Sequence, residues 1–178
     1  TQTTPLQLCL MTAQIANGGY KIKPKIIVND DPLTLEDAKN SMELQSLQKP
    51  NTRLFDDPKN IKIVQEAMFS STNEQFGTSY RSRIDDPKYQ FAGKTGTSQV
   101  KRISKREREL DLKLEQIPYK DRDHALYVAY GPYKNPRYAL SIIVEHGGSG
   151  SKAAAPMAKE LFKLIIDRDE LRDKPVSY

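Results

Sequence analysis

The second half of the chain constrains the fold most, because three extended segments there are followed by a helical one. Residues 91–100, 125–130 and 137–145 are each predicted to form a strand, and residues 133–136 (Tyr-Lys-Asn-Pro) are typical of a turn between the last two. Residues 151–166 have the apolar spacing of a helix. Strands followed by a helix that must cover them indicate an antiparallel sheet with helices on its faces, an α+β fold.

Two more helices are predicted in the first half. Thr4, Pro5 and Gln7 form a capping box with proline at the first helical position, and a Gly-Gly pair ends that helix. Asp57 and Pro58 begin the second helix. The apolar residues expected to share a face of the second helix are Ile61, Val64, Ala67 and Met68. The apolar residues available for one broad side of the last helix are Ala155, Met157, Ala158, Leu161, Phe162 and Ile165.

Two polar segments interrupt these elements. Residues 29–58 are predicted to form a surface excursion, and residues 101–122 a charged loop with a short helix that begins at Ser104. The loop carries part of the net charge of +5, and such a run is typical of a solvated face. At 178 residues and 37% hydrophobic content, we expect one domain or a large piece of one.

Several classes of protein are disfavoured. The single cysteine, Cys9, excludes a disulfide framework and is interpreted as a buried structural thiol. His124 and His146 are the only histidines and lack metal-ligand spacing, so neither a metal nor a cofactor is expected. No apolar stretch approaches the roughly 20 residues of a membrane span. The chain starts with Thr1, which indicates a piece of a longer protein whose targeting segment would lie upstream.

Two glycine-rich strings resemble other motifs only in part. The Gly-Lys-Thr string at residues 93–95 would need glycine at position 88 to be a phosphate-binding loop, but Lys88 is there. Residues 146–150 (His-Gly-Gly-Ser-Gly) would need glycine at position 151 to be a nucleophile elbow, but Ser151 is there. We interpret residues 146–150 as a turn between a strand and a helix.

The longer string at residues 91–100, with Lys-Thr-Gly-Thr at 94–97, resembles the third motif of penicillin-binding transpeptidases. Further matches follow in family order along nearly the whole chain and are similar to the elongation-type, class B enzymes of Gram-negative bacteria, the penicillin-binding protein 2 family. The matching strings lie at residues 4–7, 16–19, 76–78, 123–125, 131–132, 146–150 and 153–156.

The resemblance implies a site on residues 94–97. Lys94 would direct its ammonium into the cleft and support proton transfer around a serine. Thr95 and Thr97 would offer hydroxyls to the carboxylate of a D-alanyl-D-alanine stem peptide or a β-lactam, and the N–H of Thr97 would be one donor of the oxyanion hole. Gly96 would allow close approach of the bound chain. These residues would lie along a sheet edge to which an extended peptide is added.

The resemblance also implies that residues 1–178 are the C-terminal part of a transpeptidase domain whose nucleophilic serine lies upstream. The strings Ser46-Leu-Gln-Lys49 and Ser71-Thr-Asn73 fit the missing motifs by letter only. Ser46 lies in a polar segment, although a serine nucleophile needs a lysine on a rigid, buried helix, and Ser71 is expected at the end of the second helix. We therefore expect this chain alone to be inactive.

The implied parent is anchored in the inner membrane with this domain on the periplasmic face. Its expected partners are peptidoglycan stem peptides, β-lactam antibiotics, a membrane-embedded glycan polymerase and the elongation machinery. The chain alone is expected to self-associate, because truncation exposes apolar surface. Two alternatives remain: a β-lactam hydrolase or sensor of the same fold, and a module around residues 101–113 that binds nucleic acid or another polyanion. No aromatic interleaving supports nucleic acid as a partner.

Overall fold

The computed structural model describes residues 2–24, 52–101 and 112–172, with side chains described as far as residue 169. In chain order the main elements of these residues are α1 (Pro5–Ala16), α3 (Pro58–Asn73), β1 (Ala92–Ser98), β2 (His124–Gly131), β3 (Tyr138–Val144) and α5 (Ala155–Arg172). A π-helical turn, Gly150–Ala154, leads directly into α5. Short 3-10 helices lie at Tyr80–Ser82, Leu114–Gln116 and Tyr119–Asp121.

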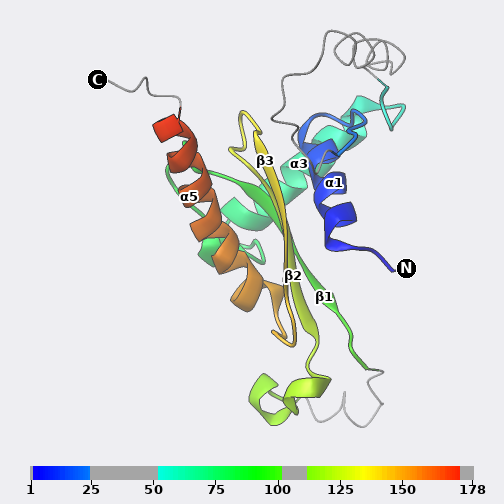
Figure 1. The fold of residues 1–178 in the computed structure, drawn as a ribbon, viewed down its shortest axis with the longest axis vertical. Helices are drawn as coiled ribbons and strands as arrows, with labels where there is room; N and C mark the ends of the chain where they lie inside the picture. Colours follow the sequence, from blue (N-terminus) through cyan, green and yellow to red (C-terminus); the bar gives the residue numbers. More distant parts are fainter. Residues whose placement is uncertain (1, 25–51, 102–111, 173–178) are drawn as a thin grey trace, which may run out of the picture.

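The three strands form one antiparallel sheet in the order β1-β2-β3. In the register of β1 with β2, Lys94 lies opposite Val128 and Thr97 lies opposite Ala125. The sheet carries helices on both faces: α5 covers one, and α1 and α3 cover the other (Figure 1). The predicted α+β fold is therefore confirmed.

The side chains of β2 alternate between these two faces, as the period of a strand requires. Tyr127 and Ala129 are fully buried in the core on the α5 side. Val128 and Tyr130 point the other way and pack with residues of α1 and α3. The central strand is thus buried on both faces, whereas β1 and β3 form the edges of the described sheet.

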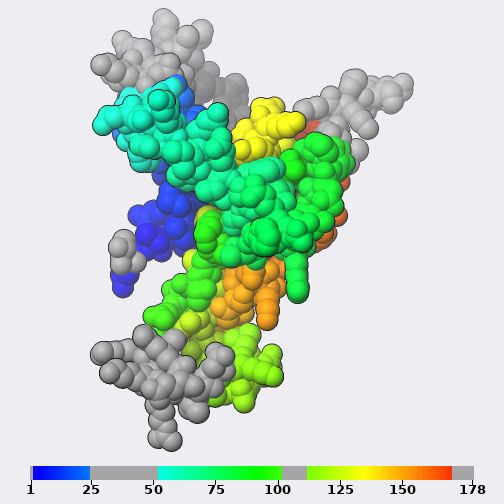
Figure 2. All heavy atoms as spheres, turned by 180° about the vertical axis from the view of Figure 1, so that it is seen from behind, coloured from blue at the N-terminus to red at the C-terminus, as the bar shows by residue number. Residues whose placement is uncertain are grey.

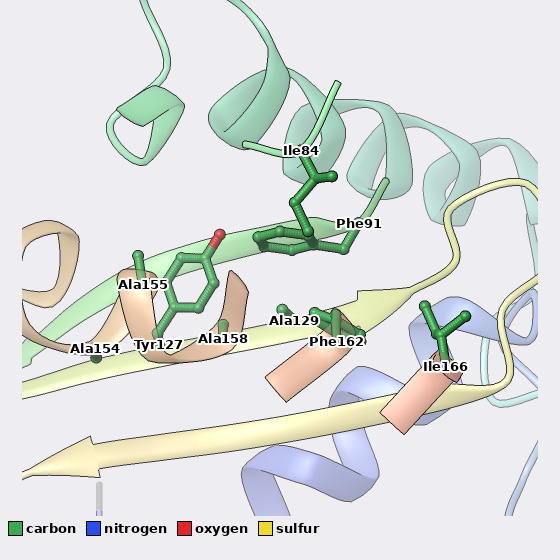
Figure 3. Packing of buried hydrophobic residues seen from close by; sticks show 9 residues of the cluster. All are labelled: Ile84, Phe91, Tyr127, Ala129, Ala154, Ala155, Ala158, Phe162 and Ile166. Atoms are coloured by element: carbon green, nitrogen blue, oxygen red, sulfur yellow. The ribbon is translucent and has the colours of Figure 1, made fainter. Parts of the chain in front are cut away.

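Aromatic rings dominate the core beneath α5. Phe162 of α5 stacks on Phe91 with ring centroids 4.8 Å apart, and Phe91 meets Tyr127 edge-on at 6.5 Å. Small residues at the start of α5, Ala155 and Ala158 among them, let the helix lie close to these rings (Figure 3). Such aromatic pairs fix the position of α5 against the start of β1.

The predicted faces of two helices are partly wrong. In α3, Ile61 and Met68 are buried as expected, but Val64 and Ala67 are exposed, and Thr72 completes the buried face. In α5, the expected face is buried at Ala155, Ala158 and Phe162, whereas Met157 and Leu161 are exposed. Apolar spacing indicates a helix, but it does not determine which side of the helix will pack against the sheet.

Other details follow the expectations. The predicted capping box of α1 is present, because Thr4 Oγ1 accepts from the Gln7 N–H while the Gln7 side chain accepts from the Thr4 N–H. The turn between β2 and β3 falls between Gly131 and Tyr138. Most of the predicted surface excursion and the helix expected at Ser104 lie outside the described residues.

Candidate functional site

The Lys-Thr-Gly-Thr string lies on β1, at the edge of the described sheet. Lys94 and Thr97 are exposed, and Thr95 and Gly96 are half-buried. The green segment that includes β1 reaches the surface when the molecule is seen from behind (Figure 2). The expected accessible strand at a sheet margin is therefore confirmed, while the roles given to its residues stay predictions.

The backbone groups of β1 alternate between the two sides of the strand. The N–H of Gly93 donates to the Thr72 hydroxyl at 3.0 Å, on the side away from β2. In an antiparallel pair, outward and inward groups alternate from residue to residue. The N–H and C=O groups of Thr95 and Thr97 therefore also point to the open edge, which is the orientation that strand addition requires.

A chain of polar side chains connects this edge to the turn after α3. The Lys94 ammonium donates to the Thr95 carbonyl oxygen at 2.9 Å and lies 3.5 Å from the Thr95 hydroxyl oxygen. The Thr95 hydroxyl lies 3.2 Å from that of Thr78, which lies 3.3 Å from that of Ser71. Lys94 and Thr95 thus present a positive charge and a held hydroxyl side by side, which suits a carboxylate ligand.

The turn that carries Thr78 is fixed against the end of α3. Both the N–H and the hydroxyl of Ser79 donate to the Ser71 carbonyl oxygen at 3.0 Å. A Cβ on Gly77 would lie 2.3 Å from that same oxygen, so only glycine fits this close approach. The sequence Gly77-Thr78-Ser79 therefore places the Thr78 hydroxyl against β1.

A buried group of hydroxyls lies directly behind the start of β1. The Tyr127 hydroxyl lies 2.9 Å from that of Thr72 and 3.1 Å from that of Ser79. Burial raises the pKa of Tyr127, and the hydrogen bonds with Ser79 and Thr72 offset part of the rise. Gly93 is required here, because a Cβ at this position would lie 2.4 Å from the Tyr127 hydroxyl oxygen.

Thr72, Thr78, Ser79 and Tyr127 had no function predicted from the sequence. Residues 76–78 entered only as part of the family resemblance, and residues 71–73 only as a string that fits a missing motif by letter. The structure places residues 71–73 at the C-terminal end of α3, as predicted. Their contacts with β1 join segments about 20 residues apart, which local patterns do not report.

The other singled-out residues lie in structural positions. The Cys9 thiol is half-buried and donates to the Ala139 carbonyl oxygen at 3.4 Å, and burial raises its pKa. The rings of His124 and His146 are in contact, with centroids 4.8 Å apart, and the His146 N–H donates to His124 Nδ1. No cluster of three or more His, Cys, Asp or Glu residues able to hold a metal occurs in the described ranges.

An edge strand with this lysine, glycine and paired threonines, on an antiparallel sheet covered by helices, is typical of penicillin-binding transpeptidases and of the β-lactamases that share the motif. Residues 1–163 match the family described as the penicillin binding protein transpeptidase domain. The chain belongs to this family.

The similar curated proteins include enzymes named peptidoglycan D,D-transpeptidase MrdA. The protein from Salmonella typhimurium is 31% identical over 92% of this chain, and that from Acinetobacter baumannii is 35% identical over 89%. The chain spans 25% of the length of the Salmonella relative and 22% of the Acinetobacter relative. These names do not favour the alternatives of a hydrolase, a sensor or a polyanion-binding module.

Solved structures of penicillin-binding protein 2 (PBP2) are also similar. The structure of Pseudomonas aeruginosa PBP2 in complex with WCK 5153 has a TM-score of 0.62 and 30% identity, covering 92% of this chain and 29% of that one. The complex between PBP2 and MreC from Helicobacter pylori matches with a TM-score of 0.61 and 28% identity, over 95% of this chain and 25% of that one. The sheet and its covering helices are thus a part of this transpeptidase fold.

Proposed function

We propose that this chain supplies one wall of the active site of a serine D,D-transpeptidase that cross-links peptidoglycan stem peptides. The observation that carries the proposal is the edge of β1, where Thr95 and Thr97 direct their backbone groups away from β2 beside the Lys94 ammonium. An extended peptide with a free carboxylate fits this edge in geometry and in charge. The names of the relatives support the same activity.

The residue roles that the family resemblance implies are compatible with this placement. The Thr97 N–H is one donor to the oxyanion that forms on the attacked carbonyl, and the Thr95 and Thr97 hydroxyls bind the terminal carboxylate. Lys94 attracts that carboxylate and supports proton transfer at the serine. Gly96 keeps the strand free of a side chain, so the bound chain approaches closely.

The nucleophile is assigned to a part of the protein that precedes these residues. Ser71 is a poor candidate because it lies at the end of α3, where its hydroxyl is 3.3 Å from that of Thr78. Within the part of the chain that the structure describes, no lysine hydrogen-bonds to it. Ser46 lies outside the described residues. With one donor of the oxyanion hole and no activated serine, the chain alone is inactive in this proposal.

The partners are those of an elongation-type enzyme. The Helicobacter relative was solved in complex with MreC, which supports a partner of this kind for the parent protein. The elongation machinery and a membrane-embedded glycan polymerase are further partners that the family resemblance implies. β-Lactams bind covalently to the parent protein, which acts at the periplasmic face of the inner membrane. Among the described residues, none of the helices has the length and apolar character needed to cross a bilayer.

Reaction with a fluorescent penicillin tests the proposal. The complete protein that contains this chain should be labelled covalently, unlabelled β-lactam should block the label, and the isolated 178 residues should stay unlabelled. Lys94→Met should lower labelling of the complete protein, whereas Lys59→Met, an exposed lysine at the far end of α3, should not. An unlabelled complete protein, or label on the isolated chain, would contradict the proposal, and rapid release of the label would indicate a hydrolase.

A further inference from the structure

Thr72 has an unusual number of polar contacts for a fully buried residue. Its hydroxyl oxygen accepts from the Gly93 N–H at 3.0 Å and lies 2.9 Å from the Tyr127 hydroxyl. It also lies 3.4 Å from the Gly93 carbonyl oxygen and 3.3 Å from the Met68 carbonyl oxygen within its own helix. A threonine hydroxyl has one proton to donate and two lone pairs. These neighbours therefore use all of its hydrogen-bonding capacity.

These contacts occupy the open edge of β1 at its start. The N–H of Gly93, which points away from β2, is taken by the Thr72 side chain. The neighbouring residue, Asn73, donates its Nδ2 to the Phe91 carbonyl oxygen at 2.9 Å. The C-terminal turn of α3 therefore covers the Phe91 carbonyl oxygen and both outward backbone groups of Gly93.

The next outward groups along β1 belong to Thr95 and Thr97. The Thr95 carbonyl oxygen accepts from the Lys94 ammonium, so the Thr95 N–H and both groups of Thr97 remain for a ligand. An incoming extended chain cannot pair further toward the N-terminus of β1, because the end of α3 lies there. A one-residue slip in strand pairing turns every side chain to the other face, so a fixed starting point also fixes the register. Thr72 and Asn73 thus act as a stop for strand addition.

We propose that Thr72 is a positioning residue of the active site, which holds Gly93 and thereby sets the register and height of the ligand on Thr95–Thr97. The inference rests on the proposed function, because it assumes that a ligand is added to this edge. Thr72 touches neither substrate nor reacting atoms and acts through the backbone of β1. Ser79 and Tyr127 support its hydroxyl from behind.

A second buried threonine provides a matched control. Thr12 in α1 is also fully buried, and its hydroxyl donates to the carbonyl oxygen four residues earlier, at 2.8 Å from Leu8. It makes the same contact within its helix as Thr72 does, and no described hydrogen bond joins it to β1. Thr12→Val therefore removes a buried hydroxyl from the same fold without releasing the strand.

The experiment measures the acylation of the complete protein by a β-lactam, with the rate constant separated from the non-covalent affinity. Thr72→Val should lower the acylation rate constant by about ten- to hundredfold, because small displacements at a reacting centre have effects of this size. Thr72→Ser keeps the hydroxyl and should restore most of the rate. Thr12→Val should stay within about twofold of the unaltered protein, since it leaves β1 in place.

Amide hydrogen exchange of the unaltered protein tests the contact directly and depends on no variant. The Gly93 amide should exchange as slowly as the paired amides of Lys94 and Gly96, whereas the Thr97 amide should exchange fast. If the Thr72→Val protein does not fold, the exchange rate of the Gly93 amide in the unaltered protein is the remaining test of the inference. Fast exchange at Gly93, or equal acylation by the Thr72→Val and Thr12→Val proteins, would overturn the inference. Failure of the unaltered protein to react would instead overturn the proposed function.

Discussion

At the scale of single residues, the site depends on two glycines of β1 that do different things. Gly93 faces the buried Tyr127 hydroxyl, which an added Cβ would approach to 2.4 Å. At Gly96 an added Cβ meets only the Leu126 Cβ, at 3.3 Å. One glycine is therefore required by the core, and the other, in our proposal, by the ligand.

Alanine at these two positions should separate stability from function. Gly93→Ala should lower the free energy of unfolding by about 1–3 kcal/mol, the range for overpacking a core. Gly96→Ala should lower it by less than about 1 kcal/mol, because the Leu126 Cβ and its backbone need to move by only a few tenths of an ångström. Urea denaturation of both variants checks the order, and a larger loss for Gly96→Ala would contradict the assignment.

The buried Tyr127 hydroxyl predicts a pH dependence of stability. Because burial raises its pKa in the folded state, the native protein keeps this proton at pH values where the unfolded chain has lost it. Its contribution is fully present below the ordinary tyrosine pKa of 10.0 and is lost as pH rises above it. The free energy of unfolding should therefore fall in alkali, starting near pH 10.

Tyr127→Phe should make this alkaline loss less steep when unfolding is followed from about pH 8 to 11. Part of the loss should remain, since burial also raises the pKa of Tyr130. Tyr119→Phe serves as the control, because Tyr119 is largely exposed. An unchanged slope in the Tyr127→Phe protein would show that the Tyr127 hydroxyl is not held as described.

At the scale of elements, the bounds of the three strands and the starts of the first two helices could be predicted from the sequence closely. Glycines, prolines and capping residues mark them locally, as the Thr4 box and the strand at residues 91–100 illustrate. The last helix was predicted to end at residue 166, but α5 continues to Arg172. The buried faces could not be predicted fully. Val64 is as apolar as its buried neighbours, and only the packing of α3 on β1 shows that Thr72 is buried in its place.

Part of the candidate site could likewise be predicted from the sequence, and part could not. Residues 94–97 could be found from their motif, because the four residues are consecutive in the sequence and lie on one strand. The contacts from Thr72 and Thr78 could not, because hydroxyl residues are common at helix ends and turns. Their importance depends on which strand the end of α3 meets, and only the folded chain settles that.

The packing of α5 should depend on the aromatic stack beneath it. Phe162 is fully buried against Phe91, so Phe162→Ala should lower the free energy of unfolding by about 3–5 kcal/mol. Leu164→Ala, on the outer side of the same helix and 66% exposed, should change it by less than about 0.5 kcal/mol. Thermal or urea unfolding of both variants measures the difference. Similar losses of stability would contradict the packing of α5 through Phe162.

At the scale of the whole molecule, apolar side chains remain exposed on several elements. They include Met157, Leu161 and Leu164 on α5 and Ile143 on β3. If the parent domain covers them, the isolated 178 residues should self-associate, because exposed apolar patches drive association. Light scattering over a range of concentrations checks this, and a single monomeric species at high concentration would contradict it.

A structure of the complete protein acylated by a β-lactam would show whether the open edge of β1 receives a peptide carboxyl end. The β-lactam carboxylate should lie within hydrogen-bond distance of the Thr95 and Thr97 hydroxyls. The acyl carbonyl oxygen should accept from the Thr97 N–H. A β-lactam bound covalently elsewhere, with residues 94–97 free of ligand, would contradict the proposed function.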